Sequence, residues 1–261
     1  MNILERIIDH KKTEVAKRKI AVPLADLERR ELFPRKTISL KETLLEGSRT
    51  GIIAEFKRKS PSKGSINEVG DIVEITKAYT KHGASGLSIL TDEFFFGGSA
   101  DDLSKARINN IPILRKDFII EEYQVMESKA MGADVILLIA ACLTSAQVKN
   151  LATLARNVGL ETLLEIHNEE ELQHICDETE LVGINNRDLK TFEVDINRSL
   201  KLRKQIPPDK IIIAESGIDN TSTIKIFKAA GFKGFLIGEK FMSSLDPATA
   251  FEQFAEQLKR S

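Results

Sequence analysis

The chain is poor in the residues that mark several protein classes. Its 261 residues include only two cysteines, Cys142 and Cys176, and no tryptophan. Two cysteines cannot build the disulfide framework of a small secreted domain. The longest apolar run, Val135–Leu143, has nine residues, about half of what a membrane-spanning helix needs. We therefore expect neither a disulfide scaffold nor a membrane protein.

Neither sign of charge is in excess. The sequence has 38 Lys and Arg against 39 Asp and Glu, a formal net charge of −1. This balance creates no general basic field for nucleic acid or an anionic membrane. The first twelve residues, MNILERIIDHKK, carry charges throughout and do not resemble a secretory signal peptide. The basic run Lys11–Lys19 is interrupted by Glu14, and we expect it to be a solvent-facing helix surface. We predict a cytoplasmic protein with no nucleic-acid or membrane partner.

Hydrophobic residues make up 42% of the chain, enough for a large core. The first 50 residues have helical periodicity and no strand signal. After Gly51, eight short apolar runs alternate with segments of helical period, which indicates βαβ units and a parallel sheet. The runs are Ile52–Phe56, Leu87–Leu90, Ile111–Leu114, Val135–Ile139, Thr162–Ile166, Leu181–Ile184, Ile211–Ala214 and Phe235–Ile237.

Eight such units in about 200 residues favour an α/β fold of the closed (β/α)₈ TIM barrel type. We predict that residues 1–261 form a single barrel domain, in which residues 1–50 are an N-terminal helical extension. An open, doubly wound sheet is the alternative.

Charged or amide side chains stand at the ends of five of the apolar runs. They are Glu55, Lys57, Lys116, Glu165, Asn185 and Glu215. Strand ends of this kind meet at the catalytic mouth of a barrel. Because strand side chains alternate between faces, Glu55 shares a face with Ile53, and Lys116 shares one with Leu114. If these faces point inward, three carboxylates and two ammonium groups gather at one mouth, as acid–base catalysis requires. The alternative is a set of ordinary surface charges.

Two residues near the fifth run receive other interpretations. Glu161 lies on the face of Glu165 but at the opposite end of the strand, so we expect a structural role. His167 follows the run, and we expect it on a surface loop; the alternative is that it reaches the mouth. The four histidines lack paired ligand spacing, and the sequence contains no GxGxxG, P-loop, HExxH or CxxC motif.

Small residues follow the last two runs and indicate an anion site. Ser216 and Gly217 come after the seventh run, and Gly238 and Glu239 after the eighth. Backbone N–H groups there can approach a phosphate, which barrels bind after these two strands. Ordinary turn glycines are the alternative.

Three consecutive aromatic residues follow the second run, in EFFFGGS (93–99). One interpretation is that they cover an aromatic substrate, with Gly97 and Gly98 as a hinge. The other is that they pack into the hydrophobic core at the end of the barrel. We assign Phe96 to the substrate and leave both readings open for Phe94 and Phe95.

Seven segments together resemble the indole-3-glycerol phosphate synthase family of tryptophan biosynthesis. They are AEFKRKSPSKG (54–64), LSILTDEFFFGGS (87–99), IPILRKDFI (111–119), LLEIHN (163–168), VGINNRDL (182–189), IAESGI (213–218) and GFLIGEKFM (234–242). KRKSPS and INNRDL are the most specific, and the resemblance runs from about Ile3 to the C-terminus. It implies ring closure, decarboxylation and dehydration of 1-(2-carboxyphenylamino)-1-deoxyribulose 5-phosphate, without cofactor or metal. It further implies a carboxy-lyase that acts as a monomer or associates weakly with other tryptophan-pathway enzymes.

The resemblance also implies roles for individual residues. Lys116 is similar to the general acid and Glu165 to its partner in dehydration, and Lys57 would contact the substrate carboxylate. Glu55 and Asn185 would orient hydroxyls and lysines, and Glu215 would stabilise developing positive charge. The substrate-binding residues would be Arg187 near the carboxylate, Ser60, Ser216, Gly217, Gly238 and Glu239 at the phosphate, and Phe96, Phe118 and Leu236 at the aromatic ring.

Rival functions share parts of this pattern. A sugar-phosphate isomerase or epimerase would use the same phosphate loops with a simpler proton shuttle. A Schiff-base aldolase would use Lys57 or Lys116 as its amine. A non-catalytic barrel that binds an anionic metabolite is the rival outside enzymes.

Overall fold

The computed structural model describes residues 2–61, 63–188, 191 and 193–260. Ser62 and Leu189, which belong to two of the segments that carry the resemblance, lie outside the described residues. Over the described ranges, no helix is both long and apolar enough to cross a membrane.

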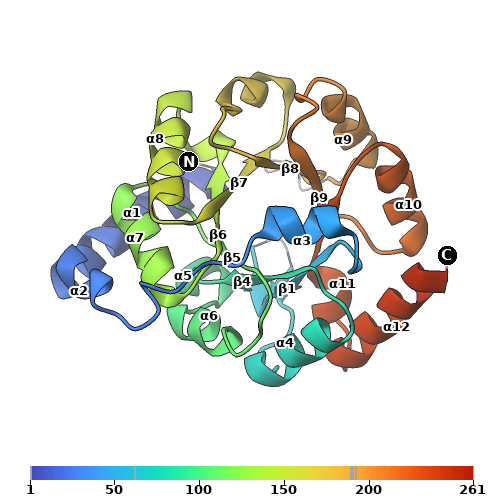
Figure 1. The fold of residues 1–261 in the computed structure, drawn as a ribbon, viewed down its shortest axis with the longest axis horizontal. Helices are drawn as coiled ribbons and strands as arrows, with labels where there is room; N and C mark the ends of the chain where they lie inside the picture. The colour runs from blue at the N-terminus through green and yellow to red at the C-terminus, as the bar shows by residue number, and fades with distance from the viewer. Residues whose placement is uncertain (1, 62, 189–190, 192, 261) are drawn as a thin grey trace.

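Eight parallel strands close into a barrel in the order β1-β10-β9-β8-β7-β6-β5-β4 (Figure 1). They are β1 (Ile52–Phe56), β4 (Gly86–Leu90), β5 (Ile113–Lys116), β6 (Val135–Ile139), β7 (Glu161–Ile166), β8 (Leu181–Asn185), β9 (Ile211–Glu215) and β10 (Gly234–Ile237). The short strands β2 (Lys59–Ser60) and β3 (Gly64–Ser65) pair antiparallel in the loop after β1. The predicted TIM barrel is confirmed, and the open doubly wound sheet is wrong.

One predicted strand begins two residues too early. The third apolar run starts at Ile111, but β5 starts at Ile113. Pro112 has no N–H to donate to the ladder, and the Ile113 N–H donates to a side-chain oxygen of Asp134, 2.8 Å away. The strand then continues to Lys116 instead of stopping before it.

Helices surround the barrel and link its strands (Figure 1). They are α4 (Ile72–Lys81), α5 (Glu93–Phe96), α6 (Ala100–Ala106), α7 (Glu122–Met131), the 3₁₀ helix η1 (Ala140–Cys142), α8 (Ser145–Asn157), the 3₁₀ helix η2 (Glu169–His174), α9 (Ile196–Arg203), α10 (Thr221–Ala229), α11 (Glu239–Met242) and α12 (Pro247–Arg260). Side-chain caps set several of their starts, as where Asp71, Thr144 and Asn220 accept from the backbone N–H three residues on.

Alternate strand residues form two separate cores. The core inside the barrel comprises Ile53, Leu114, Val135, Leu137, Ile139, Leu163, Leu181, Ile211, Ile213 and Leu236. Residues on the other strand face, such as Ile52 and Ala54, pack in a second core under the helices. Glu55 lies two residues beyond Ile53 and therefore points to the barrel interior. The predicted inward orientation of the strand-end charges is confirmed.

Three helices precede the barrel, namely α1 (Ile3–Ala21), α2 (Leu24–Glu28) and α3 (Leu40–Glu46). No described residue before Ile52 belongs to a strand, as predicted. The side chains of Leu40 and Leu44 on α3 join the interior core, so this helix closes the N-terminal end of the barrel (Figure 1). Glu161 accepts hydrogen bonds from the Ser39 hydroxyl and from the N–H groups of Leu40 and Lys41. Its predicted structural role is confirmed.

The basic run on α1 is not uniformly solvated. Lys12 and Lys19 are exposed, but the side chain of Lys11 is fully buried. Its Nζ lies 2.9 Å from carboxylate oxygens of Asp92 and Asp117, which follow β4 and β5. The predicted solvent-facing surface is therefore wrong for Lys11, because this lysine attaches α1 to the rim formed by the C-terminal ends of the strands.

Candidate active site

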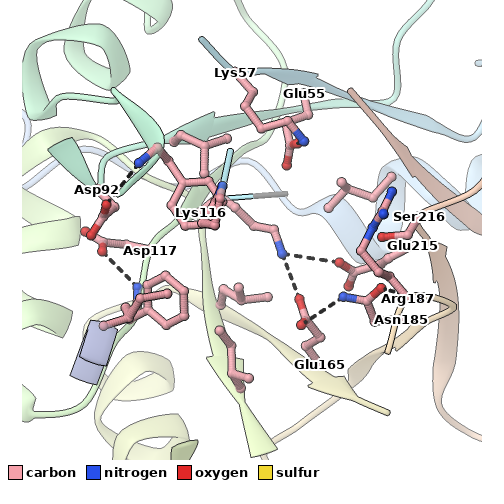
Figure 2. Close-up of a pocket in the computed structure, with 18 of the residues that line it drawn as sticks. Glu55, Lys57, Asp92, Lys116, Asp117, Glu165, Asn185, Arg187, Glu215 and Ser216 are labelled. Carbon is pink, nitrogen blue, oxygen red and sulfur yellow. Dashed lines mark hydrogen bonds and ion pairs between the residues drawn. The ribbon is translucent and has the colours of Figure 1, made fainter. Parts of the chain in front are cut away.

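One pocket lies at the C-terminal ends of the strands. Figure 2 shows its charged side chains converging from different strands. The pocket is lined by Ile3, Leu4, Ile7, Glu55, Lys57, Pro61, Leu90, Asp92, Phe96, Lys116, Asp117, Phe118, Leu137, Ile139, Glu165, Asn185, Arg187, Glu215, Ser216 and Leu236. All six candidate catalytic residues are in this set, so the predicted gathering of acid and base groups at one mouth is confirmed.

Lys116 at the end of β5 is the centre of the charged cluster. Its Nζ donates to Oε2 of Glu165 at 2.7 Å and to Oε2 of Glu215 at 3.3 Å (Figure 2). The three side chains come from β5, β7 and β9, so the closed barrel alone brings them together. Both carboxyl groups are buried. One cation is therefore shared between two acids in a site largely shielded from water.

The two carboxyl groups hold their protons differently. Burial alone would raise the pKa of Glu165, but Lys116 and His167 outweigh it and hold that pKa well below its usual range. Burial raises the pKa of Glu215 to about 8, opposed by Lys116 and aided by repulsion from Glu165. At pH 7 an ionised and a protonated carboxyl group thus stand side by side. Such a division is how one site supplies both a base and an acid.

A pH dependence of stability follows from Glu215. Its pKa rises from 4.5 to about 8 on folding, so between these values the folded protein holds a proton that the unfolded chain has lost. The free energy of unfolding therefore falls as the pH rises through this window. Glu215→Gln keeps a neutral side chain of similar shape. We expect the melting temperature of the variant, relative to that of the wild type, to increase from pH 5 to pH 8, as measured by thermal unfolding. Parallel pH curves for the two proteins would contradict this.

Glu55 and Asn185 each contact one of the other charged side chains of the pocket. Oε1 of Glu55 lies 2.9 Å from Nζ of Lys57, and its Oε2 accepts from the Ser88 hydroxyl at 3.2 Å. Asn185 donates to Oε1 of Glu165 at 3.2 Å. The structure thus places Glu55 against a lysine, as the resemblance implies, but Asn185 against Glu165 instead.

A second hollow adjoins the pocket at the ends of β9 and β10. It is lined by Glu55, Lys57, Ser60, Arg187, Ser216, Gly217, Ile218, Leu236, Ile237, Gly238, Glu239 and Lys240. All five residues predicted for the phosphate are among them. Glu239 turns its carboxylate toward Arg187 and Lys63, with distances of 3.4 Å to each. This leaves the backbone start of α11 facing the hollow.

The backbone after β9 adopts an unusual conformation. Ser216 has φ of 66°, the only positive φ among the described residues other than glycine, and Gly217 follows at 70°. Consecutive left-handed residues cost about 1–3 kcal/mol where a side chain is present, and such strain concentrates at ligand sites. Asn186 supports the turn by donating to the Ser216 carbonyl at 2.8 Å.

The aromatic residues after β4 divide between two tasks. Phe96 lines the pocket opposite Phe118, with 6.0 Å between ring centroids. Phe94 stacks on His10 of α1 at 4.6 Å, and Phe95 meets the same ring edge-on at 5.6 Å. Neither ring belongs to the buried core, so the core-plugging interpretation is wrong for both, and their part in covering a substrate stays a prediction. A hinge at Gly98 is also unsupported, because a Cβ there would lie 2.1 Å from the Leu90 carbonyl oxygen.

His167 is the main residue for which the favoured sequence interpretation is wrong. It is only 6% exposed, and its Nε2 lies 3.1 Å from Oε1 of Glu165. The predicted surface-loop position is wrong, because η2 folds back and encloses the ring. The only sequence signal was its place two residues after Glu165, which on an extended chain puts both side chains on one face.

Three apolar residues of α1 also line the pocket, namely Ile3, Leu4 and Ile7. Their shared helix face was visible in the sequence, but its partner was not. Among the described residues, no group of three or more His, Cys, Asp or Glu side chains is arranged to hold a metal ion.

Comparisons with known proteins agree on one family. The family model described as indole-3-glycerol phosphate synthase matches residues 4–254. An indole-3-glycerol phosphate synthase of Bacteroides thetaiotaomicron is 45% identical over 259 residues, covering 99% of both chains. One from Caldanaerobacter subterraneus subsp. tengcongensis is 44% identical over 245 residues, covering 92% of this chain and 93% of the relative.

Solved structures support the fold. KGPDC from Streptococcus mutans matches with a TM-score of 0.61 at 13% identity, covering 80% of this chain and 97% of that one. Tryptophan synthase subunit alpha from Legionella pneumophila matches with a TM-score of 0.59 at 13% identity, covering 85% and 97%. At this identity the likeness concerns the barrel alone. The family match over nearly the whole length, joined to the acid–base pocket, shows that this chain belongs to the indole-3-glycerol phosphate synthase family.

Proposed function

We propose that the chain converts 1-(2-carboxyphenylamino)-1-deoxyribulose 5-phosphate to indole-3-glycerol phosphate, carbon dioxide and water, with Lys116 and Glu165 as its acid–base pair. The observation that carries this proposal is the buried contact of 2.7 Å between these two side chains at the barrel mouth. Membership of a family of carboxy-lyases in tryptophan biosynthesis supports it. The proposal assigns a role to each end of the pocket and to each bond that changes.

The pocket has two chemically different ends that suit the two ends of the substrate. The phosphate would lie against Ser60, Ser216, Gly217, Gly238 and the backbone of Glu239. Carboxyanilino ring atoms would lie between Phe96 and Phe118, with Leu236 on the apolar side. Holding both ends brings the ring carbon that bears the carboxylate against the ketone carbon. Such placement holds the two reacting carbons close together, so the reaction does not have to wait for a rare conformation of the free substrate.

The first step is ring closure. The ring carbon attacks the ketone carbon, a C–C bond forms, and the ketone oxygen takes a proton from Lys116. Burial would lower the pKa of Lys116, but the carboxylates of Glu165, Glu215 and Glu55 outweigh it and keep the side chain protonated. The lysine therefore enters the cycle as an acid. A substrate that draws Nζ away from Glu165 weakens this hold and makes the proton available.

The next two steps break bonds. The C–CO₂ bond cleaves, and its electron pair restores the aromatic ring. The hydroxyl group then leaves as water with a second proton, while Glu165 accepts a proton from the neighbouring carbon as the indole double bond forms. Two protons enter and one leaves, so one proton is drawn from solvent per turnover. Glu215, protonated near pH 7, is placed to reprotonate Lys116.

The remaining side chains hold the substrate without exchanging protons. Lys57, fixed by Glu55, would face the departing carboxylate. It should not bind that group too tightly, because stabilising the ground state alone does not accelerate the reaction. Arg187 borders both hollows and would bind the carboxylate from the phosphate side.

We also propose that residues 1–261 act as one domain, in a monomer, in the cytoplasm. The described residues of a single chain line the whole pocket, so the site does not depend on a second copy. Cys142 and Cys176 are free thiols, which suits a reducing compartment. Light scattering of the purified protein measures the monomer directly.

The decisive experiment for the reaction is a fluorescence assay. Purified protein is mixed with the carboxyphenylamino ribulose phosphate, without added metal or cofactor, and indole emission is followed over time. We expect a steady rise, with one carbon dioxide released per indole formed. If folded protein binds the substrate without any rise, the proposed reaction is wrong and a binding-only barrel is favoured. A sugar-phosphate product without an indole signal would instead point to an isomerase or epimerase.

A further inference from the structure

A histidine lies enclosed between two carboxylates beside the acid–base pair. Nε2 of His167 is 3.1 Å from Oε1 of Glu165, and Nδ1 is 3.2 Å from Oε2 of Glu171. The backbone N–H of His167 also donates to that Glu171 oxygen at 2.7 Å. The chain is thus clamped at η2 so that the ring faces Glu165. The proposed acid–base chemistry assigns no task to this ring.

The surroundings favour a positively charged ring. Burial alone would lower the pKa of His167, but Glu165 and Glu171 outweigh it and raise the pKa to about 9. Cys142 on η1 stays neutral, because burial raises its pKa to about 12. Lys116 and Glu215 stand beyond Glu165. On the outer side, the charged residues that share hollows with the ring are Glu169, Asp188, Asp195, Arg198 and Lys201.

The two oxygens of Glu165 are held in different ways. Oε2 receives the Lys116 ammonium group at 2.7 Å, while Oε1 receives Asn185 at 3.2 Å and faces His167. In the proposed reaction, Lys116 turns to the substrate oxygen and leaves Oε2. A buried carboxylate that loses its only cation takes up a proton and is no longer a base. A second cation that does not contact the substrate prevents this.

We infer that His167 is a positioning residue, a buried imidazolium bridged to Glu171 that keeps Glu165 ionised and oriented while Lys116 serves the substrate. The inference deepens the proposed function and rests on it for the part played by Glu165. Glu171 has the complementary task of holding the ring and its charge. Neither residue contacts the substrate.

Four variants separate charge, polarity and packing. His167→Gln retains a polar side chain near Glu165 but no charge, and His167→Leu retains neither. Glu171→Gln keeps an acceptor for the ring and removes the second carboxylate. His174→Gln is the matched control, because His174 is a buried histidine of η2 whose nitrogens face only the backbone oxygens of Glu171 and Leu143.

The pH profile of kcat, which reports the groups of the enzyme–substrate complex, distinguishes positioning from mere structure. In His167→Leu we expect kcat to fall by about 100-fold with KM within about threefold, and the acid limb to move up by about one pH unit, since Glu165 then ionises less readily. His167→Gln should recover most of kcat but keep the shifted limb. Glu171→Gln should bring the alkaline limb to lower pH, as the imidazolium loses its proton sooner. His174→Gln should leave both limbs in place. Unmoved limbs in His167→Leu, or equal shifts in His174→Gln, would overturn the inference.

A second measurement needs no turnover and so remains informative if the proposed reaction fails. The chain has four histidines, and ¹⁵N-labelled imidazole resonances report the protonation of each. We expect one ring, absent from the spectrum of His167→Gln, to remain doubly protonated at pH 8. A neutral His167 ring at pH 7 would overturn the inference whatever the activity assay shows.

Discussion

Replacing Lys116 by alanine is expected to lower kcat by about three orders of magnitude in a protein that still folds. The ammonium group supplies the proton for ring closure, and a positioned general acid contributes about 10²–10⁴ in rate. Without it, Glu165 and Glu215 lose their shared cation. Glu215 is already protonated near pH 7, and His167 remains beside Glu165, so the barrel need not unfold to relieve them. The measurements are kcat from indole fluorescence and the fold from circular dichroism.

Two comparisons make this result specific. Glu165→Gln should lower kcat by a similar factor. The kcat of the double variant should be far higher than the product of the two single losses would give, because the residues act as one unit. Lys41→Ala is the matched control, since Lys41 pairs with Glu180 at the opposite end of the barrel. It should keep wild-type kcat. The acid–base assignment is wrong if Lys116→Ala or Glu165→Gln retains near wild-type kcat. It is also wrong if Lys41→Ala lowers kcat as much as these two variants do.

The barrel could be predicted because its signals are local. The apolar runs are short and separated by segments of helical period, and alternation along each strand decides which side chain faces the interior. For Glu55 and Lys116 this rule sufficed, as both lie two residues beyond an interior residue. The error at β5 arose where an apolar residue, Ile111, precedes a proline and stays outside the ladder. Ile111 is apolar because it is buried, and not because it belongs to the hydrogen-bonded strand.

The features of the site that could not be predicted depend on contacts between segments that are distant in the sequence. Lys11 was read as solvated because its neighbours along the helix are charged, whereas its partners lie about 80 and 105 residues further along the chain. His167 was placed on a loop because no strand rule covers residues beyond a strand end. Its burial depends on η2 turning back across it, which periodicity does not encode. The packing of Phe94 and Phe95 against His10 could not be predicted for the same reason, because His10 is on α1.

Replacing Lys11 by methionine is expected to destabilise the fold by about 3–5 kcal/mol, the cost of leaving buried charges without their partner. Lys11 and its partners Asp92 and Asp117 are all inaccessible to solvent at their side chains. Methionine fills a similar volume, so a cavity is not the cause of the loss. Lys12→Met is the matched control on the same helix, because Lys12 is 65% exposed and lies 3.6 Å from Asp9. Lys12→Met should lower the free energy of unfolding by no more than about 0.5 kcal/mol. Chemical denaturation of the three proteins measures the differences.

The pH dependence of this loss identifies its origin. Burial would raise the pKa of Asp117, but Lys11 and Arg115 outweigh it and hold that pKa below its usual range. A carboxyl group of this kind stabilises the fold above its unfolded pKa, and the contribution fades as the pH falls. The deficit of Lys11→Met should therefore be largest near pH 7 and shrink toward pH 3. Loosening α1 also frees Ile3, Leu4 and Ile7 from the pocket, so KM should rise in Lys11→Met and not in Lys12→Met. A deficit that is independent of pH, or one shared by both variants, would mean that Lys11 contributes packing and not charge.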